Sequence, residues 1–453
     1  MTEVQRRTEM PVSARALFDW HERSGAFDRL TPAWMPVELR HREGGIRDGA
    51  RVTIALPMGP IAIPWTLGHT GYKAGEEFRD IQIRGPFRRW EHIHRMEPVS
   101  DHASVLDDRI SFALPVPPFG DLVAGWYTRR ELTRLLQWRH TLTRNDLDRH
   151  ARFAARGPRT IAITGASGMV GSALVPFLTT GGHTVRTIGR GSSSTVRWDP
   201  ARGQLDPAAL DGVDTVVHLA GENVGARWTA ARRRAIVDSR LQGTRLIAEA
   251  IAKMPRKPEV LVSASAIGIY GSRGDEWLDE SSALGGDFLA EVGQQWEAAT
   301  APAREAGVRV VHLRTGIVLA AGGGALGKML LPFQLGAGGV LGNGRQWMSW
   351  ISREDLIGAI HHAIQTPSLL GAMNAVAPAP VTNREFTKTL GRVLRRPTIA
   401  PVPAFLLRAL FGEMAEGTVL ASQRVRPTAL EGSGFSFLHR TLEDALRFEL
   451  GRP

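Results

Sequence analysis

The stretch that most restricts the fold of this chain is residues 160–171, which read TIAITGASGMVG. A short apolar run leads into a glycine-rich turn and a helical pattern, and a second apolar run, HTVRTIGR, follows at the spacing of a βαβ unit. Gly165 is expected to allow a tight turn, Gly168 to let the main chain approach a pyrophosphate, and Gly171 to let the helix pack close to the strand. N–H groups at the start of the helix would face the anion. The pattern predicts a dinucleotide site; the alternative is a purely structural glycine turn.

From residue 159 onward, apolar strand patterns alternate with helical ones. The strands are rich in Val and Ile and lack polar alternation, as in DTVVHLAGEN, EVLVSASAIGIYG and VRVVHLRTGIVL, which is typical of parallel strands buried on both faces. We therefore predict an α/β fold with a doubly wound parallel Rossmann sheet over 159–400 and a smaller C-terminal lobe over 401–448. The predicted helices and strands become shorter after about residue 320, and this part of the chain is expected to form a lobe on the substrate side of the site.

The first 148 residues require a separate α+β domain, because the βαβ alternation begins only after them. They read as a strand, a helix over 13–30, a succession of strands separated by glycine and proline turns, and a final helix over about 119–148. An antiparallel sheet that curls around one long helix would enclose a cavity. Residues 149–158 are polar and arginine-rich and end in Gly-Pro, so they are predicted to be a linker.

Composition argues against several kinds of metal and redox chemistry. The chain contains no cysteine, which excludes disulfides, thiolate catalysis and Cys-ligated metals. His92 and His94 lie two residues apart on one predicted strand face and could form a metal pair. The sequence around them carries no carboxylate motif, so we interpret them as ordinary strand-face histidines. No metal site is predicted.

The formal net charge of +11 is carried mainly by arginine, which is spread along the whole chain. No stacking-aromatic signature of RNA binding accompanies it, so a solvated basic surface is preferred to a nucleic-acid site. No run approaches the roughly 18–20 apolar residues of a membrane span, and the N-terminus lacks a signal-peptide core. We expect a cytoplasmic protein without membrane association, in which an oligomer is compatible with the sequence.

The end of the second strand is predicted to select the cofactor. An acidic residue there would bind the ribose 2′-hydroxyl of NAD, whereas an arginine favours a 2′-phosphate. This chain has Gly189-Arg190 followed by glycine and serines, without an acid. NADP(H) is therefore the predicted cofactor; the alternative is that Arg190 is merely exposed and NAD binds equally well. Leu219, Ala220 and Gly221 close the next strand and are placed to line the cofactor.

Two resemblances extend these inferences. The element order of residues 1–148, with GPFRRWEHIHRMEP in its middle, resembles the START-like helix-grip (SRPBCC, polyketide cyclase-like) domains. That resemblance implies a pocket for an apolar, small-molecule ligand. The motifs HLAGENV, DSRLQGTRL, SASAIGIYG, GDFLAEV, LRTGIVL, GGGALGKMLLPFQLGAGGVLGNGRQWMSWI and PVTNREF resemble the extended short-chain dehydrogenase/reductase (SDR) superfamily. They match most closely its atypical epimerase-family subgroup with a C-terminal domain of unknown function (DUF1731).

The second resemblance implies NADP(H) as the cofactor and assigns it further contacts. By position, these come from the glycine loop, including Ser167, Met169 and Val170, and from Arg190, Leu219, Ala220 and Arg240 of the DSR motif. A glycine-rich loop at residues 322–324 is expected to lie over the site.

The chain departs from the wider superfamily at its catalytic triad. Working members use a Ser or Thr four residues before the Tyr of the strand motif, and a Tyr-x-x-x-Lys pair on the next helix, in which lysine lowers the pKa of the tyrosine. Here the corresponding positions are Ala266, Leu289 and Gly293. The standard Ser/Tyr/Lys triad is absent.

Three other residues are candidates for a catalytic role. Tyr270 and Ser265 lie where the strand opens toward the expected nicotinamide. Glu222 is a carboxylate directly after Leu219–Gly221, which we call the LAG segment. Each also has a structural alternative: Tyr270 as a packing residue with a satisfied hydroxyl, Ser265 as a backbone partner, and Glu222 as a helix-start or arginine partner.

The leading hypothesis is an NADP(H)-dependent oxidoreductase or epimerase of atypical SDR type. Its substrate would be apolar and presented by the fused N-terminal domain. The alternative is an NADPH-binding regulatory or sensor protein without catalysis, which the missing triad favours. A lipid carrier with a structural reductase-like half is weaker, because the phosphate loop is intact.

Overall fold

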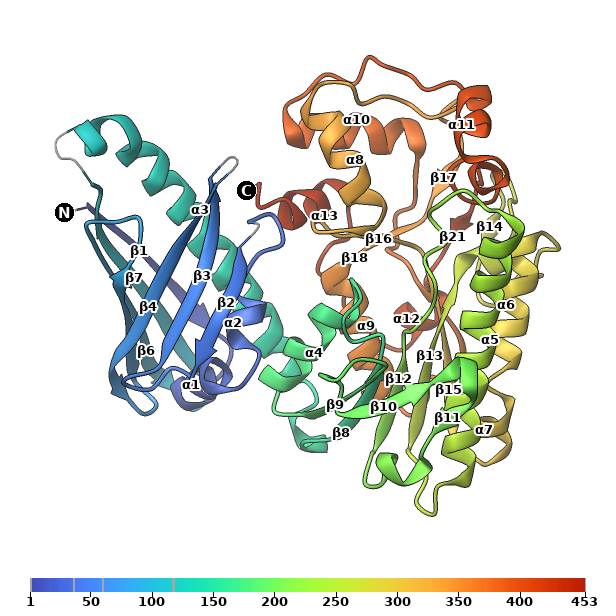
Figure 1. Ribbon diagram of the computed structural model, residues 1–453, viewed down its shortest axis with the longest axis horizontal. Helices are drawn as coiled ribbons and strands as arrows, with labels where there is room; N and C mark the ends of the chain where they lie inside the picture. The colour runs from blue at the N-terminus through green and yellow to red at the C-terminus, as the bar shows by residue number, and fades with distance from the viewer. Residues whose placement is uncertain (1, 36, 59–60, 116–118, 453) are drawn as a thin grey trace. The chain divides into compact units, whose positions relative to one another are not determined.

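The computed structural model describes residues 2–35, 37–58, 61–115 and 119–452, which form two compact units (Figure 1). The N-terminal unit is formed mainly by Met1–Gly157, and the C-terminal unit mainly by Pro158–Val175 and His183–Leu450. No helix in the described ranges is long and apolar enough to cross a membrane.

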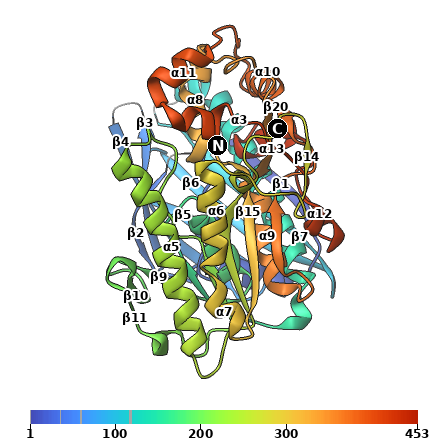
Figure 2. The same cartoon turned by 90° about the vertical axis from the view of Figure 1, so that its right-hand side faces the viewer.

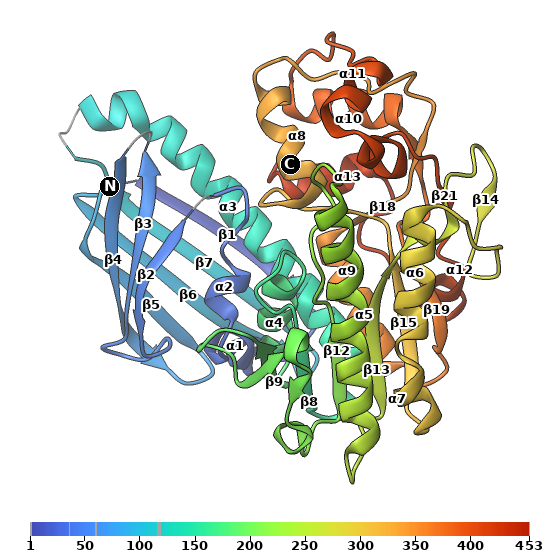
Figure 3. The same cartoon turned by 45° about the vertical axis from the view of Figure 1, so that its right-hand side comes forward.

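The N-terminal unit is a seven-stranded antiparallel sheet with the order β1-β7-β6-β5-β4-β3-β2. Its strands are β1 (Thr2–Met10), β2 (Glu38–Glu43), β3 (Arg51–Met58), β4 (Ile61–Lys73), β5 (Glu77–Arg84), β6 (Arg89–Ser100) and β7 (Ala103–Ala113). The long helix α3 (Phe119–Ala151) lies along one face of this sheet (Figure 3). Leu136 of α3 packs in one core with Ile110 and Phe112 of β7. The predicted helix-grip architecture is confirmed.

Two details of this unit differ from the sequence prediction. The helix expected over 13–30 is broken into α1 (Ala14–Glu22) and α2 (Ala26–Arg29), because Gly25 adopts a φ of +98° between them. The final helix continues to Ala151, and the 3₁₀ turn η1 (Ala154–Arg156) follows it. The segment predicted as a linker is therefore partly helical.

The C-terminal unit is built on an eight-stranded sheet with the order β11-β10-β9-β8-β12-β13-β15-β19, in which only β10 and β11 pair antiparallel. Its strands are β8 (Thr160–Thr164), β9 (Thr184–Gly189), β10 (Val196–Asp199), β11 (Gln204–Leu205), β12 (Thr215–His218), β13 (Val260–Ala266), β15 (Arg309–Thr315) and β19 (Gly371–Ala375). The predicted parallel Rossmann sheet is confirmed.

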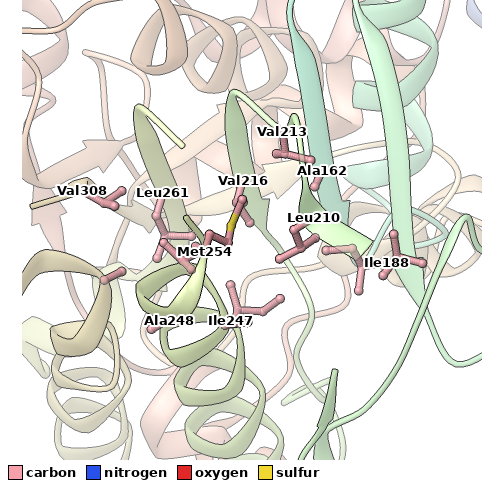
Figure 4. Close-up of a cluster of buried hydrophobic side chains, with 14 of the residues drawn as sticks. Ala162, Ile188, Leu210, Val213, Val216, Ile247, Ala248, Met254, Leu261 and Val308 are labelled. Atoms are coloured by element: carbon pink, nitrogen blue, oxygen red, sulfur yellow. The ribbon is translucent and has the colours of Figure 1, made fainter. Parts of the chain in front are cut away.

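Helices cover both faces of this sheet. The helices α5 (Ala230–Lys253), α6 (Phe288–Ala298) and α7 (Ala301–Glu305) lie on one face (Figure 2). The helix α9 (Arg353–Gln365) and the first turns of α4 (Gly171–Thr180) lie on the other (Figure 1). Apolar side chains of the strands meet those of α5 in a buried cluster that includes Val216, Leu261 and Ile247 (Figure 4). Each such side chain contributes roughly 1.5–3 kcal/mol by burial, so this cluster fixes the strands that carry the site loops.

A C-terminal lobe is assembled from shorter elements around a second core that contains Trp350, Phe386 and Leu446. Helices α8 (Gly324–Gln334), α10 (Asn383–Leu394) and α13 (Leu442–Glu449) contribute to this core, and α11 (Ala404–Phe411) and the π-turn η5 (Ala415–Val419) belong to the same lobe. The helix α12 (Thr428–Gly432) packs against β19 of the main sheet. Its short strands are β14 (Trp277–Leu278), β16 (Ile317–Leu319), β17 (Trp347–Met348), β18 (Trp350–Ser352), β20 (Val381–Thr382) and β21 (Arg424–Val425). Residues before position 401 therefore also contribute to this lobe, in keeping with the shorter elements expected after about residue 320.

Candidate dinucleotide site

The glycine loop connects β8 to α4 at the carboxyl edge of the parallel sheet. Gly165 has a φ of +69°, and a Cβ there would lie 2.9 Å from the amide nitrogen of Ala220. A Cβ on Gly171 would overlap the carbonyl oxygen of Gly165 and crowd Ala166, so α4 begins directly against the loop. Ser167 and Gly168 lie exposed at the tip. Both ends of the loop therefore require glycine, and its tip is open to a ligand.

Thr164, the last residue of β8, fixes the loop that follows β12. Its Oγ1 accepts hydrogen bonds from the backbone N–H groups of Leu219 (3.1 Å) and Ala220 (3.2 Å). With both lone pairs used, the Thr164 hydroxyl donates its proton to Nδ1 of His218, 2.8 Å away. Two cofactor candidates, the glycine loop and the LAG segment, are thus held together by one buried threonine.

His218 extends this connection toward α5 and α6. Because its Nδ1 accepts from Thr164, the neutral ring carries its proton on Nε2 and donates to Oγ1 of Thr244 at 2.9 Å. The same oxygen accepts from Nε1 of Trp296 at 2.9 Å. Burial lowers the pKa of His218 to about 4, so the ring stays neutral at physiological pH. The sequence analysis missed this relay, since threonine and histidine in apolar strands carry no distinctive spacing.

Arg240, which the family resemblance implied as a cofactor contact, lies beside Leu219–Gly221. Its Nη1 donates to the carbonyl oxygens of Glu222 (3.0 Å) and Ile236 (3.2 Å), and its guanidinium lies 4.7 Å from the ring centre of Trp296. A Cβ on Gly221 would come within 3.7 Å of that guanidinium. Burial lowers the pKa of Arg240 to about 10, which leaves it charged. A fixed positive charge therefore stands next to Leu219–Gly221.

Arg190 follows β9 at the same edge of the sheet and is exposed. It borders a groove of about 320 Å³ together with Arg197 of β10. Arg197 is the register partner of Gly189, which explains why two arginines seven residues apart meet at one groove. The remaining lining residues are Trp198, Asp199, Gln204, Leu205 and Asp206. The sequence analysis missed Arg197, because only the pairing of β9 with β10 places it there.

The glycine-rich loop at 322–324 approaches the phosphate loop. A Cβ on Gly324 would lie 2.9 Å from Sδ of Met169, and one on Gly323 would lie 3.7 Å from the same atom. Met169, predicted to contact the cofactor, is therefore covered by the start of α8. Val170 lies half-buried beside it and accepts from the N–H groups of the first turn of α4.

Two catalytic candidates, Tyr270 and Ser265, belong to a buried ionic network. The Tyr270 hydroxyl donates to Oδ1 of Asn374 (2.7 Å) and accepts from Nη1 of Arg314 (3.0 Å). Ser265 donates to Oε1 of Glu297 (2.7 Å), which Arg314 holds through two contacts of 2.8 Å. Burial raises the pKa of Tyr270, and Arg314 only partly offsets this effect. For Tyr270 this environment favours the structural alternative over a proton-accepting role, whereas Ser265 is bound to a side-chain carboxylate and not to the backbone, as its structural alternative had it.

The third candidate, Glu222, forms an ion pair with Nη1 of Arg232 at 2.9 Å. Its backbone N–H donates to Oγ of Ser239 at 3.1 Å. Glu222 therefore lies at the edge of the cofactor loop as an arginine partner, the alternative considered from the sequence. Its catalytic role remains a prediction.

The positions of the missing triad have their own packing. Ala266 is exposed at the end of β13, and Leu289 is half-buried beside Gly268. Gly293 is buried, and a Cβ on it would lie 3.0 Å from Cβ of Ile269. The helix α6 packs closely on the turn η4 (Ile267–Tyr270), so a side chain at position 293 would require Ile269 to shift by a few tenths of an ångström.

The histidine pair of the N-terminal unit faces inward from β6 and is buried. The carboxylates that the neighbouring sequence lacks come from neighbouring strands. Asp80 of β5 is the register partner of His92, and Asp108 of β7 is the register partner of His94. The premise that these histidines have no carboxylate near them is therefore wrong.

Both family models that match this chain fall mainly within its C-terminal unit. Residues 161–375 match the NAD dependent epimerase/dehydratase family, and residues 402–449 match DUF1731, a domain of unknown function. Epimerase family protein Mb2239 of Mycobacterium bovis is 44% identical over 297 residues, which cover 65% of this chain and 98% of that protein.

Two solved structures extend the comparison. A nucleoside-diphosphate sugar epimerase from Corynebacterium glutamicum is 34% identical with a TM-score of 0.81, and the match covers 99% of this chain and 90% of that one. Human epimerase family protein SDR39U1, crystallised with NADPH, is 34% identical with a TM-score of 0.60 over 64% of this chain and 99% of the human chain. The match to the Corynebacterium protein includes the N-terminal unit as well as the Rossmann unit.

Proposed function

Because the chain belongs to the NAD dependent epimerase/dehydratase family, we propose that it is an NADP(H)-dependent oxidoreductase that acts on an apolar substrate. The observation that carries the cofactor assignment is the groove bordered by Arg190 and Arg197. Two guanidinium groups at the end of the second strand suit a 2′-phosphate, which NAD lacks. NADPH in the crystal structure of human SDR39U1 supports the same choice.

The backbone of the glycine loop suits the pyrophosphate of such a cofactor. Ser167 and Gly168 lie exposed at its tip, next to the first turn of α4. Arg240 adds a fixed positive charge beside Gly221, where the cofactor would pass over β12. A nicotinamide cofactor supplies or accepts a hydride when it is bound. The residues of this chain would position it and exclude water.

Apolar side chains form one wall of the proposed substrate site near the end of β13, and they favour an apolar substrate. Ala266 and Leu289 replace the polar triad residues there. Trp228 stacks edge-on against Phe288 with ring centres 5.2 Å apart. A Cβ on Gly417 of η5 would lie 2.7 Å from the Trp228 ring and 3.8 Å from Leu289, so the C-terminal lobe closes this wall. An apolar carbonyl compound fits these side chains better than a free sugar does.

One observation favours the second candidate, an NADPH-binding sensor without catalysis. The positions of the triad tyrosine and lysine hold Leu289 and Gly293, and the hydroxyl of Tyr270 is buried with two partners. A site of this kind can bind the nucleotide without an evident proton donor.

The two candidates are separated by a binding titration followed by an activity screen. The purified chain is titrated with NADPH and NADH by calorimetry, with Gly165→Val as the control in which the loop backbone is blocked. Oxidation of NADPH is then followed with ketones and enones of increasing apolar length. Preferential NADPH binding with turnover supports the oxidoreductase. Tight NADPH binding without turnover on any compound favours the sensor, and failure to bind either nucleotide contradicts both.

A further inference from the structure

A cluster of buried polar side chains lies on the inner face of the N-terminal sheet, away from the dinucleotide site. Among the described residues, one carboxylate oxygen of Asp80 and one ring nitrogen each of His92 and His94 lie within 4.8 Å of one another. The two histidines share a face of β6 because they are two residues apart, and Asp80 lies opposite His92 on β5. All three residues are less than one-tenth exposed.

Two of the three distances within this cluster are close to those between metal ligands. Oδ2 of Asp80 lies 3.4 Å from Nδ1 of His92 and 3.5 Å from Nε2 of His94. Both distances exceed the roughly 2.7–3.2 Å of an N–H···O hydrogen bond. A tetrahedral zinc ion with bonds of about 2.0–2.1 Å separates its ligand atoms by about 3.3–3.4 Å. An octahedral site with bonds of similar length would bring adjacent ligands to about 3.0 Å, so the spacing favours zinc.

The outer partners of His94 and Asp80 are arranged as in metal sites, whereas Nε2 of His92 has no hydrogen-bond partner among the described residues. Nδ1 of His94 lies 2.8 Å from Oδ1 of Asp108, so the other nitrogen of that ring, Nε2, can present its lone pair to an ion. Nε1 of Trp90 donates to Oδ1 of Asp80 at 3.1 Å, which leaves Oδ2 for the cluster. A ligating histidine that donates its second N–H to a carboxylate is the usual arrangement, because it fixes the tautomer and the ring orientation.

The two carboxylates of Asp80 and Asp108 require positive charge nearby. Arg139, a half-buried arginine, interacts electrostatically with both of them and offsets only one. Nε2 of His92 is buried without a hydrogen-bond partner among the described residues and lies 3.9 Å from Asp108. Buried unpaired charge is costly, so a bound divalent ion or protonated histidines must balance the second carboxylate.

We propose that Oδ2 of Asp80, Nδ1 of His92 and Nε2 of His94 bind a zinc ion in the interior of the helix-grip unit. Three protein ligands leave a fourth position for a water molecule or for an oxygen atom of a small ligand. Asp108 is a positioning residue that orients His94. This assignment is independent of the function proposed for the Rossmann unit, and it reverses the expectation from the sequence that no metal binds.

The test measures metal content of the full chain, purified without a polyhistidine tag. The protein is stripped with dipicolinate, titrated with Zn²⁺, freed of excess metal on a desalting column and analysed by mass spectrometry of the metal. We expect one zinc ion per chain, lost in Asp80→Asn and in His94→Ala. His102→Ala, which removes an exposed histidine, is the matched control and keeps the full zinc content.

Two further measurements do not depend on the folding of the ligand variants. Co²⁺ bound to the stripped wild-type chain should give the intense visible absorption of a four-coordinate site. Asp108→Asn should bind zinc about 10- to 100-fold more weakly at unchanged stoichiometry. A wild-type chain that binds no zinc, a weak octahedral Co²⁺ spectrum, or ligand variants that fold and retain zinc would overturn the proposal in favour of a metal-free ionic cluster.

Discussion

Gly293 of α6 faces Ile269 of η4 so closely that a Cβ on the glycine would lie 3.0 Å from the Cβ of the isoleucine. This contact fixes the distance between α6 and the end of β13. A side chain at position 293 would press on Ile269, which would have to move by a few tenths of an ångström. Restoring the triad in this chain would therefore require Ile269 or α6 to shift, in addition to the new side chains.

We predict that Gly293→Lys destabilises the chain by about 1–3 kcal/mol through overpacking. The double variant Leu289→Tyr with Gly293→Lys should not acquire the hydride-transfer activity of a standard triad. Urea unfolding measures the first effect. Gly432→Lys is the matched control, since the space around Gly432 on α12 is open, and it should change stability little. A stable Gly293→Lys variant would show that α6 can move away from η4.

The groove at the end of β9 predicts a cofactor preference. Arg190→Ala should weaken NADPH binding about tenfold to hundredfold, because a charge-assisted hydrogen bond contributes about 1.5–3 kcal/mol. NADH binding should not change. Arg197→Ala should act in the same direction, and Arg190→Asp should shift the preference toward NADH. Calorimetric titration with both nucleotides measures these effects.

The matched control for the groove variants is Arg245→Ala. Arg245 is an exposed arginine of α5 that pairs with Glu249 at 2.8 Å, and neither residue lines the groove. It should leave both affinities unchanged. Equal losses for NADPH and NADH in Arg190→Ala would contradict the 2′-phosphate assignment and indicate a general electrostatic effect.

The Rossmann sheet and its loop could be predicted because their signals are local. The run Val260–Val262 and the spacing of Gly165 and Gly171 are visible in the chain itself. The pairing of Asp80 with His92 and of Arg197 with Gly189 is set by strand register, which no short motif reports. Such residues become neighbours only when the order of the strands is known.

The surroundings of the catalytic candidates also could not be predicted from the sequence. Tyr270 was expected where its strand opens toward the nicotinamide, yet its hydroxyl meets Asn374 from β19 and Arg314 from β15. Both partners lie far away in the sequence. The motif therefore predicted the strand β13, but Tyr270 itself lies in the turn η4 after it, and its partners could not be read from the sequence.

We predict that Tyr270→Phe acts on stability and not on the reaction. Two buried polar groups, on Asn374 and Arg314, would each lose a partner, at a cost of about 1–3 kcal/mol. The NADPH affinity and any NADPH oxidation should stay unchanged. Tyr127→Phe, at an exposed tyrosine of α3, is the control and should be neutral. Loss of turnover with unchanged stability would instead restore the catalytic assignment of Tyr270.

The buried neutral His218 predicts an acid-dependent loss of stability. Its pKa is about 4 in the folded chain, lowered by burial from the 6.5 expected when unfolded. Between these values the unfolded chain binds the extra proton, so stability is full above pH 6.5 and is lost as the pH falls toward 4. At pH 5 the titration of His218 lowers the free energy of unfolding by about 2 kcal/mol relative to its value above pH 6.5.

The test variant is His218→Gln, which removes the titration and retains a donor and an acceptor for Thr164 and Thr244. Urea midpoints of both proteins measured from pH 7.5 to pH 5 should therefore converge as the pH falls, since other buried groups such as His21 contribute equally to both. Parallel pH profiles would mean that the pKa of His218 is the same in the folded and the unfolded chain. The hydrogen bonds of His218 to Thr164 and Thr244 would then tolerate a charged ring.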